Sequence, residues 1–107
     1  MPDGGGAEKF VIDNDFLFVR GQLGIEDEKK YSEALFKLLN SGHKDINIDF
    51  SALDYVSSSY IGATGLLIMM AQEKQVTPLL IVNEKIEKTF RMAGLHEMVE
   101  FKVVPGP

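Results

Sequence analysis

Residues 46–71 read INIDFSALDYVSSSYIGATGLLIMMA, and this stretch decides the fold. Its first five residues, 46–50, alternate apolar and polar side chains, which predicts a β-strand. A short connection follows, and the three serines Ser57, Ser58 and Ser59 stand directly before an apolar run over 61–71. That run is long for a strand and leads into polar residues, so we predict a helix. The stretch is thus a strand, a loop with three serines and a helix.

The residues upstream predict a hairpin and an amphipathic helix. Two short β-rich runs, 10–12 and 16–19, are separated by Asp13-Asn14-Asp15, and these residue types favour turns. Between about 26 and 41 the apolar residues fall on one helical face, while acidic residues gather in the first turn, where the helix dipole favours them. The face consists of Tyr31, Leu35, Leu38 and Leu39, with Ala34 beside them.

The residues downstream complete an α/β pattern. Residues 78–82 are apolar throughout, as expected of a strand in a sheet that is covered on both faces. Asn83 is expected to cap a helix that Gly94 ends. The core face of this helix is predicted to hold Ile86, Phe90 and Ala93, and residues 98–104 can supply the last strand. The order β-β-α-β-α-β-α-β predicts an α/β fold with a mixed, mainly parallel sheet, an N-terminal antiparallel hairpin and three to four helices packed on the sheet.

Composition limits the classes of protein. With 45% hydrophobic and 25% charged residues, the 107 residues suit one soluble domain, which we place at 9–104, between a flexible tail over 1–8 and a loose end at 105–107. A formal charge of −5 argues against binding to nucleic acid or anionic lipid. No apolar run reaches the roughly 20 residues of a membrane span, and the N-terminus lacks a secretory signal pattern. We therefore expect a cytoplasmic protein.

The sequence offers no visible catalytic machinery. Cysteine is absent, which excludes disulfides, thiolate zinc sites and a cysteine nucleophile. His43 and His96 are isolated, without the partners that a metal site or acid–base pair needs. Neither a Gly-x-Ser-x-Gly elbow nor a phosphate-binding glycine loop is present. We therefore predict a protein that is not an enzyme and carries no cofactor and no metal.

Two features remain, the serine cluster and the apolar helix that follows it. One serine is explained by a helix N-cap, but three exposed serines also suit a kinase acceptor site. A phosphate at the helix N-terminus would be tolerated by the fold and would repel an acidic or apolar partner. The helix has more apolar residues than one core-facing stripe needs. Burial of the helix on most sides explains this, and so does an apolar strip left for a partner; the two interpretations are compatible.

Three stretches of the chain resemble one known family. They are FVRGQLG at 18–24, IDFSALDYVSSSYIG at 48–62, and FRMAGL at 90–95 followed by VEF at 99–101. In this order and at this spacing they resemble the STAS family, the bacterial anti-sigma factor antagonists and their relatives in stress-signalling complexes and transporter tails. The resemblance extends from about residue 10 to residue 101 and implies the STAS-like fold.

The resemblance also implies a site and a partner. The phosphorylated serine or threonine of the family falls on Ser58. The implied partner is an anti-sigma factor that is also a serine kinase, or another signalling protein, with a phosphatase that reverses the modification. The implied partner-binding residues are Gly24, Ser57, Ser58, Ser59, Tyr60 and Ile61. Three of these depart from the family pattern, because Gly24 and Ser57 replace aspartates and Tyr60 places a bulky ring where the family has glycine.

Two hypotheses follow from these observations. The first is a regulatory binding module that docks a kinase or other signalling partner through residues 57–60 and the following helix, switched by phosphorylation of Ser58. The second is a structural STAS subunit of a stress-signalling scaffold or transporter-associated complex, without phosphorylation, which the two lost carboxylates and Tyr60 favour. An oligomer is possible under either hypothesis.

Overall fold

The computed structural model describes residues 8–107, so the expected tail over 1–8 lies outside the described residues except for Glu8. The helices and strands follow the predicted order, with two single-turn 3-10 helices added. The elements are β1 (Phe10–Asp13), β2 (Phe16–Val19), η1 (Ile25–Asp27), α1 (Glu28–Leu39), β3 (Asp45–Asp49), α2 (Ser58–Glu73), β4 (Thr77–Val82), α3 (Glu84–Met92), η2 (Leu95–Glu97) and β5 (Glu100–Val103).

The five strands form one sheet in the order β1-β2-β3-β4-β5. The pair β1 and β2 is antiparallel, and every other neighbouring pair is parallel. Asn14 turns the hairpin with φ of 57°, a left-handed conformation that asparagine tolerates better than most residues. The predicted α/β class with a mixed, mainly parallel sheet and an opening antiparallel hairpin is therefore confirmed.

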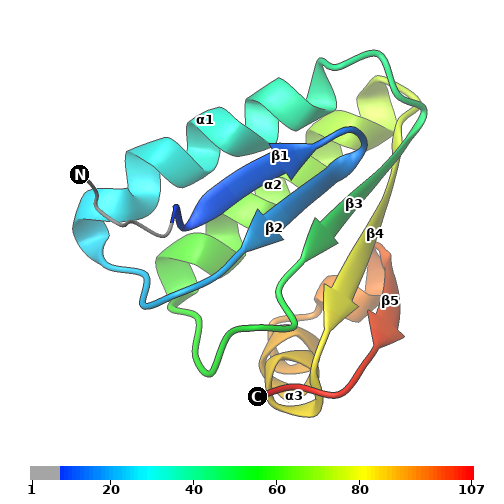
Figure 1. The fold of residues 1–107 in the computed structure, drawn as a ribbon. Helices are drawn as coiled ribbons and strands as arrows, with labels where there is room; N and C mark the ends of the chain where they lie inside the picture. The colour runs from blue at the N-terminus through cyan, green and yellow to red at the C-terminus, as the bar shows by residue number, and fades with distance from the viewer. Residues whose placement is uncertain (1–7) are drawn as a thin grey trace.

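The three α-helices pack on one face of the sheet and enclose the core. In Figure 1, α2 passes behind β1 and β2, and the core lies between these layers. The buried residues of α1 are the four that the sequence predicted. In α3 only two of three are correct, since Ile86 and Phe90 are buried but Ala93 is exposed. Ala93 is the C-cap, one residue beyond the last helical turn, and therefore leaves the core-facing stripe.

The second face of the sheet differs from the expectation. Alternate residues of each strand point to opposite faces, so Leu80 and Val82 of β4 enter the core while Leu79 and Ile81 do not. Within residues 8–107, no helix packs on the face that carries Leu79 and Ile81. The prediction of a sheet covered on both faces is thus wrong for the described chain, because all three helices belong to one layer.

Candidate functional site

The three serines lie at the start of α2. Ser57 is the N-cap, with extended backbone at φ −80° and ψ 166°, and the helix begins at Ser58. The side chain of Ser57 makes no capping hydrogen bond. Ser57 therefore occupies the N-cap position, but its hydroxyl does not have the capping role that the sequence suggested for a serine here. Ser58 and Ser59, in the first helical turn, are exposed. We call residues 57–60 the serine loop.

The connection before the serine loop is fixed by the buried side chain of Asn83. This amide, 4% exposed, donates to the carbonyl oxygens of Ser51 at 3.0 Å and Leu53 at 2.7 Å. Its Oδ1 accepts the amide hydrogen of Ile86 at 2.9 Å and so caps α3, as the sequence predicted. One residue therefore joins the start of α3 to the connection between β3 and α2. The side chains of Leu53 and Val56, in the same connection, are buried in the core.

Tyr60, one of the partner-binding residues that the resemblance implied, is buried. Its side chain is 2% exposed, and its ring packs against Tyr31 with centroids 5.1 Å apart. The hydroxyl donates to the carbonyl oxygen of Gly24 at 2.6 Å, which ties α2 to the connection between β2 and α1. Burial raises the pKa of Tyr60 to about 12, and Asp27, Glu28 and Glu26 add to the effect. The ring therefore lies inside the fold, and its hydroxyl holds α2 against the connection between β2 and α1.

Gly24 is held from its other side by a charged pair. Its amide donates to Oδ2 of Asp27 at 2.9 Å, and the same oxygen binds Nζ of Lys9 at 2.8 Å. Lys9 also donates to the carbonyl oxygen of Gln22 at 2.6 Å. The hydrogen bond from Lys9, followed by that from the Gly24 amide, lowers the pKa of Asp27. The serine loop is thus linked through Tyr60 and Gly24 to the start of β1.

Glu26 supplies a carboxylate beside Gly24, which sequence reasoning missed. A Cβ built on Gly24 would lie 2.5 Å from Oε1 of Glu26, so the Glu26 side chain occupies the space that an aspartate at position 24 would enter. The expected loss of negative charge at this point is therefore offset by the residue two positions later. A position-by-position comparison does not detect this replacement, because the carboxylate belongs to a residue two positions later in the same connection.

The helix α2 is buried on one side and leaves an apolar strip exposed on the other, so both interpretations of its apolar residues hold in part. Thr64, Leu67, Ile68 and Ala71 are buried, together with Tyr60. Leu66 and Met69 are more than half exposed, and Gly62 lies on the same face. No charged residue occurs from position 55 to position 72. A shallow apolar groove of about 40 Å³ beside this face separates α2 from α1 and is lined by Ser32, Leu35, Phe36, Ala63, Leu66, Leu67 and Met70.

The half-buried Ile61, the last of the predicted partner-binding residues, packs partly against the core. The structure thus brings Gly24, Ser57, Ser58, Ser59 and Tyr60 to one end of the molecule, and of these Ser58 and Ser59 are exposed. The two histidines are not part of this group. Within residues 8–107, no cluster of three or more histidine, cysteine or acidic residues is suitable for a metal ion.

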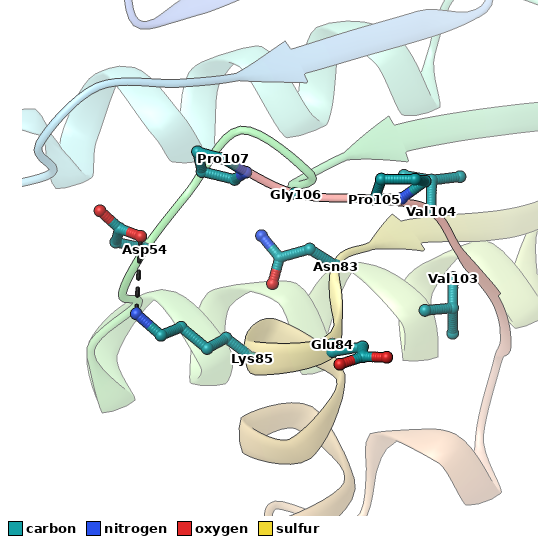
Figure 2. Close-up of a pocket in the computed structure, with 9 residues that line it drawn as sticks. All are labelled: Asp54, Asn83, Glu84, Lys85, Val103, Val104, Pro105, Gly106 and Pro107. Carbon is teal, nitrogen blue, oxygen red and sulfur yellow. Dashed lines mark ion pairs between the residues drawn. The ribbon is translucent and has the colours of Figure 1, made fainter.

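An open hollow of about 560 Å³ lies between the connection before the serine loop, the start of α3 and the end of the chain. Figure 2 shows Asp54 and Lys85 across its mouth, where they form an exposed ion pair at 3.6 Å. The end at 105–107, which the sequence predicted to be loose, runs past Asn83, and a Cβ on Gly106 would be 2.6 Å from the Cβ of Asn83. All polar atoms of the Asn83 side chain are engaged, so this buried side chain offers no unpaired group to a ligand in the hollow.

Comparison with known proteins identifies the fold. No known family model matches the sequence, and no curated protein is significantly similar to it. The crystal structure of a candidate anti-sigma factor antagonist from Thermotoga maritima superposes with a TM-score of 0.70 at 20% identity, over 89% of this chain and 84% of that one. An NMR structure of the same protein gives 0.69 at 20% identity, over 91% and 79%.

The described chain therefore has the STAS-like α/β fold that the three sequence stretches indicated, with the antiparallel hairpin first and the parallel strands after it. In this fold the serine loop begins the second helix, at the carboxyl end of the third strand. Among the helices of residues 8–107, none has the length and apolar character that crossing a membrane requires.

Proposed function

We propose that this chain is a cytoplasmic regulatory binding module of the anti-sigma factor antagonist type, which docks an anti-sigma factor or related serine kinase. The docking surface consists of the exposed serines, Ser58 and Ser59, and the outward face of α2. The main support is that Ser58 is exposed at the first position of a 16-residue helix whose outward face is uncharged as far as position 72 and exposes Leu66 and Met69. The fold shared with candidate anti-sigma factor antagonists supports the same class.

Phosphorylation of Ser58 would act as the switch. The phosphate adds about −1.5 to −2 charges and lies at a helix N-terminus, where the helix dipole favours it by up to about 1 kcal/mol. The fold would therefore keep its stability. A partner that covers Gly62, Leu66 and Met69 would have to desolvate the same phosphate, and that cost disfavours the complex. A phosphatase would restore binding.

The test is phosphorylation by a candidate serine kinase with ATP, followed by mapping of the phosphate by mass spectrometry. We expect the modification on Ser58, and we expect Ser58→Ala to bind the kinase while Ser58→Glu binds at least tenfold more weakly. Lys88→Gln, at an exposed position of α3 outside the docking surface, is the control, since it lowers the net charge by the same unit and should leave binding unchanged. Equal binding of Ser58→Glu and wild type would show that Ser58 is not a switch.

A structural subunit without phosphorylation is the second candidate function. It is favoured by the link from Tyr60 to Gly24, which ties the serine loop to the neighbouring connection. It is also favoured by Glu26, Asp27 and Glu28, whose charges lie near the Tyr60 hydroxyl and would oppose a phosphate close to it. Native mass spectrometry distinguishes the two. A stable complex that is insensitive to both Ser58 variants supports the structural subunit.

A further inference from the structure

The sheet face turned away from the helices carries a second apolar cluster. It consists of Val11 from β1, Phe16 and Phe18 from β2, and Leu79 and Ile81 from β4. The rings of Phe16 and Phe18 stack with centroids 5.4 Å apart and an interplanar angle of 14°. Ile81 is only 8% exposed, yet neither it nor the other four residues belongs to the core under the helices.

This cluster is unusual for the position that it occupies. Four of the five strands are paired in parallel, and parallel sheets are normally covered on both faces. In residues 8–107 the helices cover one face, and β4 nevertheless has apolar residues on both. An apolar patch that the fold itself leaves open marks an interaction surface. The proposed function does not use it, because the serine loop and α2 belong to the other layer.

The strand register gives this face two rows that extend across all five strands, besides the shorter pair Asp45 and Thr77. The first row, from β1 to β5, is Val11, Phe18, Asp49, Ile81 and Lys102. The second row, one pleat further along, is Asp13, Phe16, Asn47, Leu79 and Glu100. At β2, β3, β4 and β5 the two rows carry matching or complementary side chains.

We propose that this face binds the same face of a second copy of the chain. The two copies are related by a two-fold axis that is parallel to the two rows and lies midway between them. Such an axis places the first row of each copy on the second row of the other. Phe18 then packs on Phe16 of the second copy, and Ile81 packs on Leu79 of the second copy. Because the interface is isologous, each pairing occurs twice.

The charges at β5 and β3 complement each other in this arrangement. Lys102 of each copy faces Glu100 of the other, and Asp49 faces the amide of Asn47. A two-fold axis along the strands would instead place Asp49 on Asp49 and Asp13 on Glu100 of the second copy. Juxtaposed like charges disfavour an interface. The charges on this face therefore favour the axis parallel to the rows over the axis along the strands.

The size of the face indicates a reversible dimer. Strand spacing and residue rise give it a footprint of about 24 by 17 Å, or roughly 400 Å², which is about half of the 800 Å² per partner in a stable complex. We therefore expect dissociation in the micromolar range. The concentration dependence of the mass, measured by sedimentation equilibrium on the full chain, is the first observation to make.

A charge exchange at β5 provides the decisive test. Glu100 and Lys102 are both exposed, so their substitution leaves the core intact. We expect Lys102→Glu to weaken the dimer at least tenfold, since it creates two glutamate pairs. The double variant Glu100→Lys, Lys102→Glu should restore dimerisation to near the wild-type level. Lys88→Glu on α3, an exposed lysine in the helical layer, makes the same change in net charge and should have no effect.

Three outcomes would overturn the proposal. A full chain that stays at 11.9 kDa up to several hundred micromolar shows that the face has another occupant or none. A dimer that Lys102→Glu leaves unchanged uses a different surface. Failure of the double variant to recover dimerisation, with an unchanged circular dichroism spectrum, shows that Glu100 and Lys102 do not face each other. None of these outcomes bears on the Ser58 switch, because no kinase is present.

Discussion

The hydroxyl of Tyr60 joins α2 to the connection between β2 and α1, at a residue 36 positions earlier in the chain. Within residues 8–107, no other group in the first turn of α2 forms a hydrogen bond with Gly24. The ring also fills space against Tyr31, so a substitution must keep the ring to separate the two effects. Phenylalanine satisfies that condition.

We expect Tyr60→Phe to lower the free energy of unfolding by about 1 kcal/mol, the typical value of one hydrogen bond. The amide hydrogens of residues 25–27 should exchange faster, because Gly24 loses its tie to α2. Tyr31→Phe is the matched control, since it removes a buried hydroxyl that bonds Thr64 instead. It should cost a similar amount without affecting exchange in residues 25–27. Equal exchange in both variants would contradict the positioning role of Tyr60.

Asp27 gives the same region a dependence on acid. Its pKa is lowered in the folded protein by Lys9 and the Gly24 amide, so the unfolded chain binds its proton more readily. The stabilisation from Asp27 is therefore fully present above the ordinary value of 3.8 and is lost as the pH falls below it. We expect Asp27→Asn to be less stable at neutral pH and to lose less stability on acidification. Urea titrations of the wild type and of Asp27→Asn, at neutral pH and below pH 3.8, measure how much stability each protein loses on acidification. Equal losses in the two proteins would contradict the assignment.

At the scale of elements, α2 contains a glycine that its own packing does not explain. A Cβ on Gly62 would meet nothing within 4 Å, although glycine in a helix interior costs about 0.5–1 kcal/mol relative to alanine. Gly65, one turn later, approaches Leu95 so that an added Cβ would lie at an ordinary contact distance of 3.6 Å. The absence of a side chain at position 62 is thus a feature of the outward face.

We expect Gly62→Ala to raise the free energy of unfolding by about 0.5–1 kcal/mol and to weaken partner binding. The weaker binding would follow from an added methyl group between α2 and the docked surface. Gly65→Ala, on the inward side of the same helix, should give a similar or smaller gain in stability without affecting affinity. Thermal unfolding and calorimetric titration with the kinase measure both quantities. Unchanged affinity of Gly62→Ala would remove α2's outward face from the interface.

The connection between β3 and α2 depends on α3 through Asn83. We expect Asn83→Ala to lower the free energy of unfolding by about 2–4 kcal/mol, since it removes the helix cap and the donor to one buried and one part-buried carbonyl group. Amides of residues 51–56 should also lose protection. Asn40→Ala, at the exposed end of α1, should cost less than about 0.5 kcal/mol. A small, equal loss in both variants would show that Asn83 does not fix the connection.

At the scale of the whole molecule, the two proposed surfaces lie on opposite layers. The partner surface belongs to the helical layer, and the self-association surface is the bare face of the sheet. Neither surface blocks the other, so a dimer would present two serine loops. The molecule would then act as a bivalent adaptor.

We expect native mass spectrometry to detect two copies of the chain with two copies of the partner. The Lys102→Glu variant should form a complex of one with one, with the same affinity per site, because it changes the sheet face alone. A two-to-two complex is expected only if the partner docks on α2 and the sheet faces also associate. A complex of two chains with a single partner would show that the surfaces are not independent.

Local sequence patterns predicted most of the fold. The turn residues 13–15, the alternation at 46–50 and the single apolar face of α1 each depend on neighbours in the chain, and each prediction is confirmed. The pattern of α3 was wrong at Ala93 because the last turn ends one residue earlier. Boundaries of this kind depend on capping geometry, which a periodic pattern does not specify.

The site was less predictable than the fold. The position of Ser58 at the start of α2 followed from the sequence, since a polar cluster before an apolar run marks a helix terminus. The burial of Tyr60 did not, because it depends on contacts with Tyr31 and Gly24, which lie far from it in the sequence. The approach of Glu26 to Gly24 did not either, because it depends on the backbone conformation of η1, which the sequence pattern does not specify. A residue's exposure is a property of its three-dimensional neighbours.

By itself, the sequence determined the order of elements, the α/β class and the place of the serines, because these follow from periodicity and turn chemistry within short segments. Only the tertiary structure decided which faces are covered. The apolar residues on both sides of β4 predicted two layers of cover, and the structure places all three helices in one layer. Whether a second layer forms depends on where the crossovers run, and no local pattern encodes that choice.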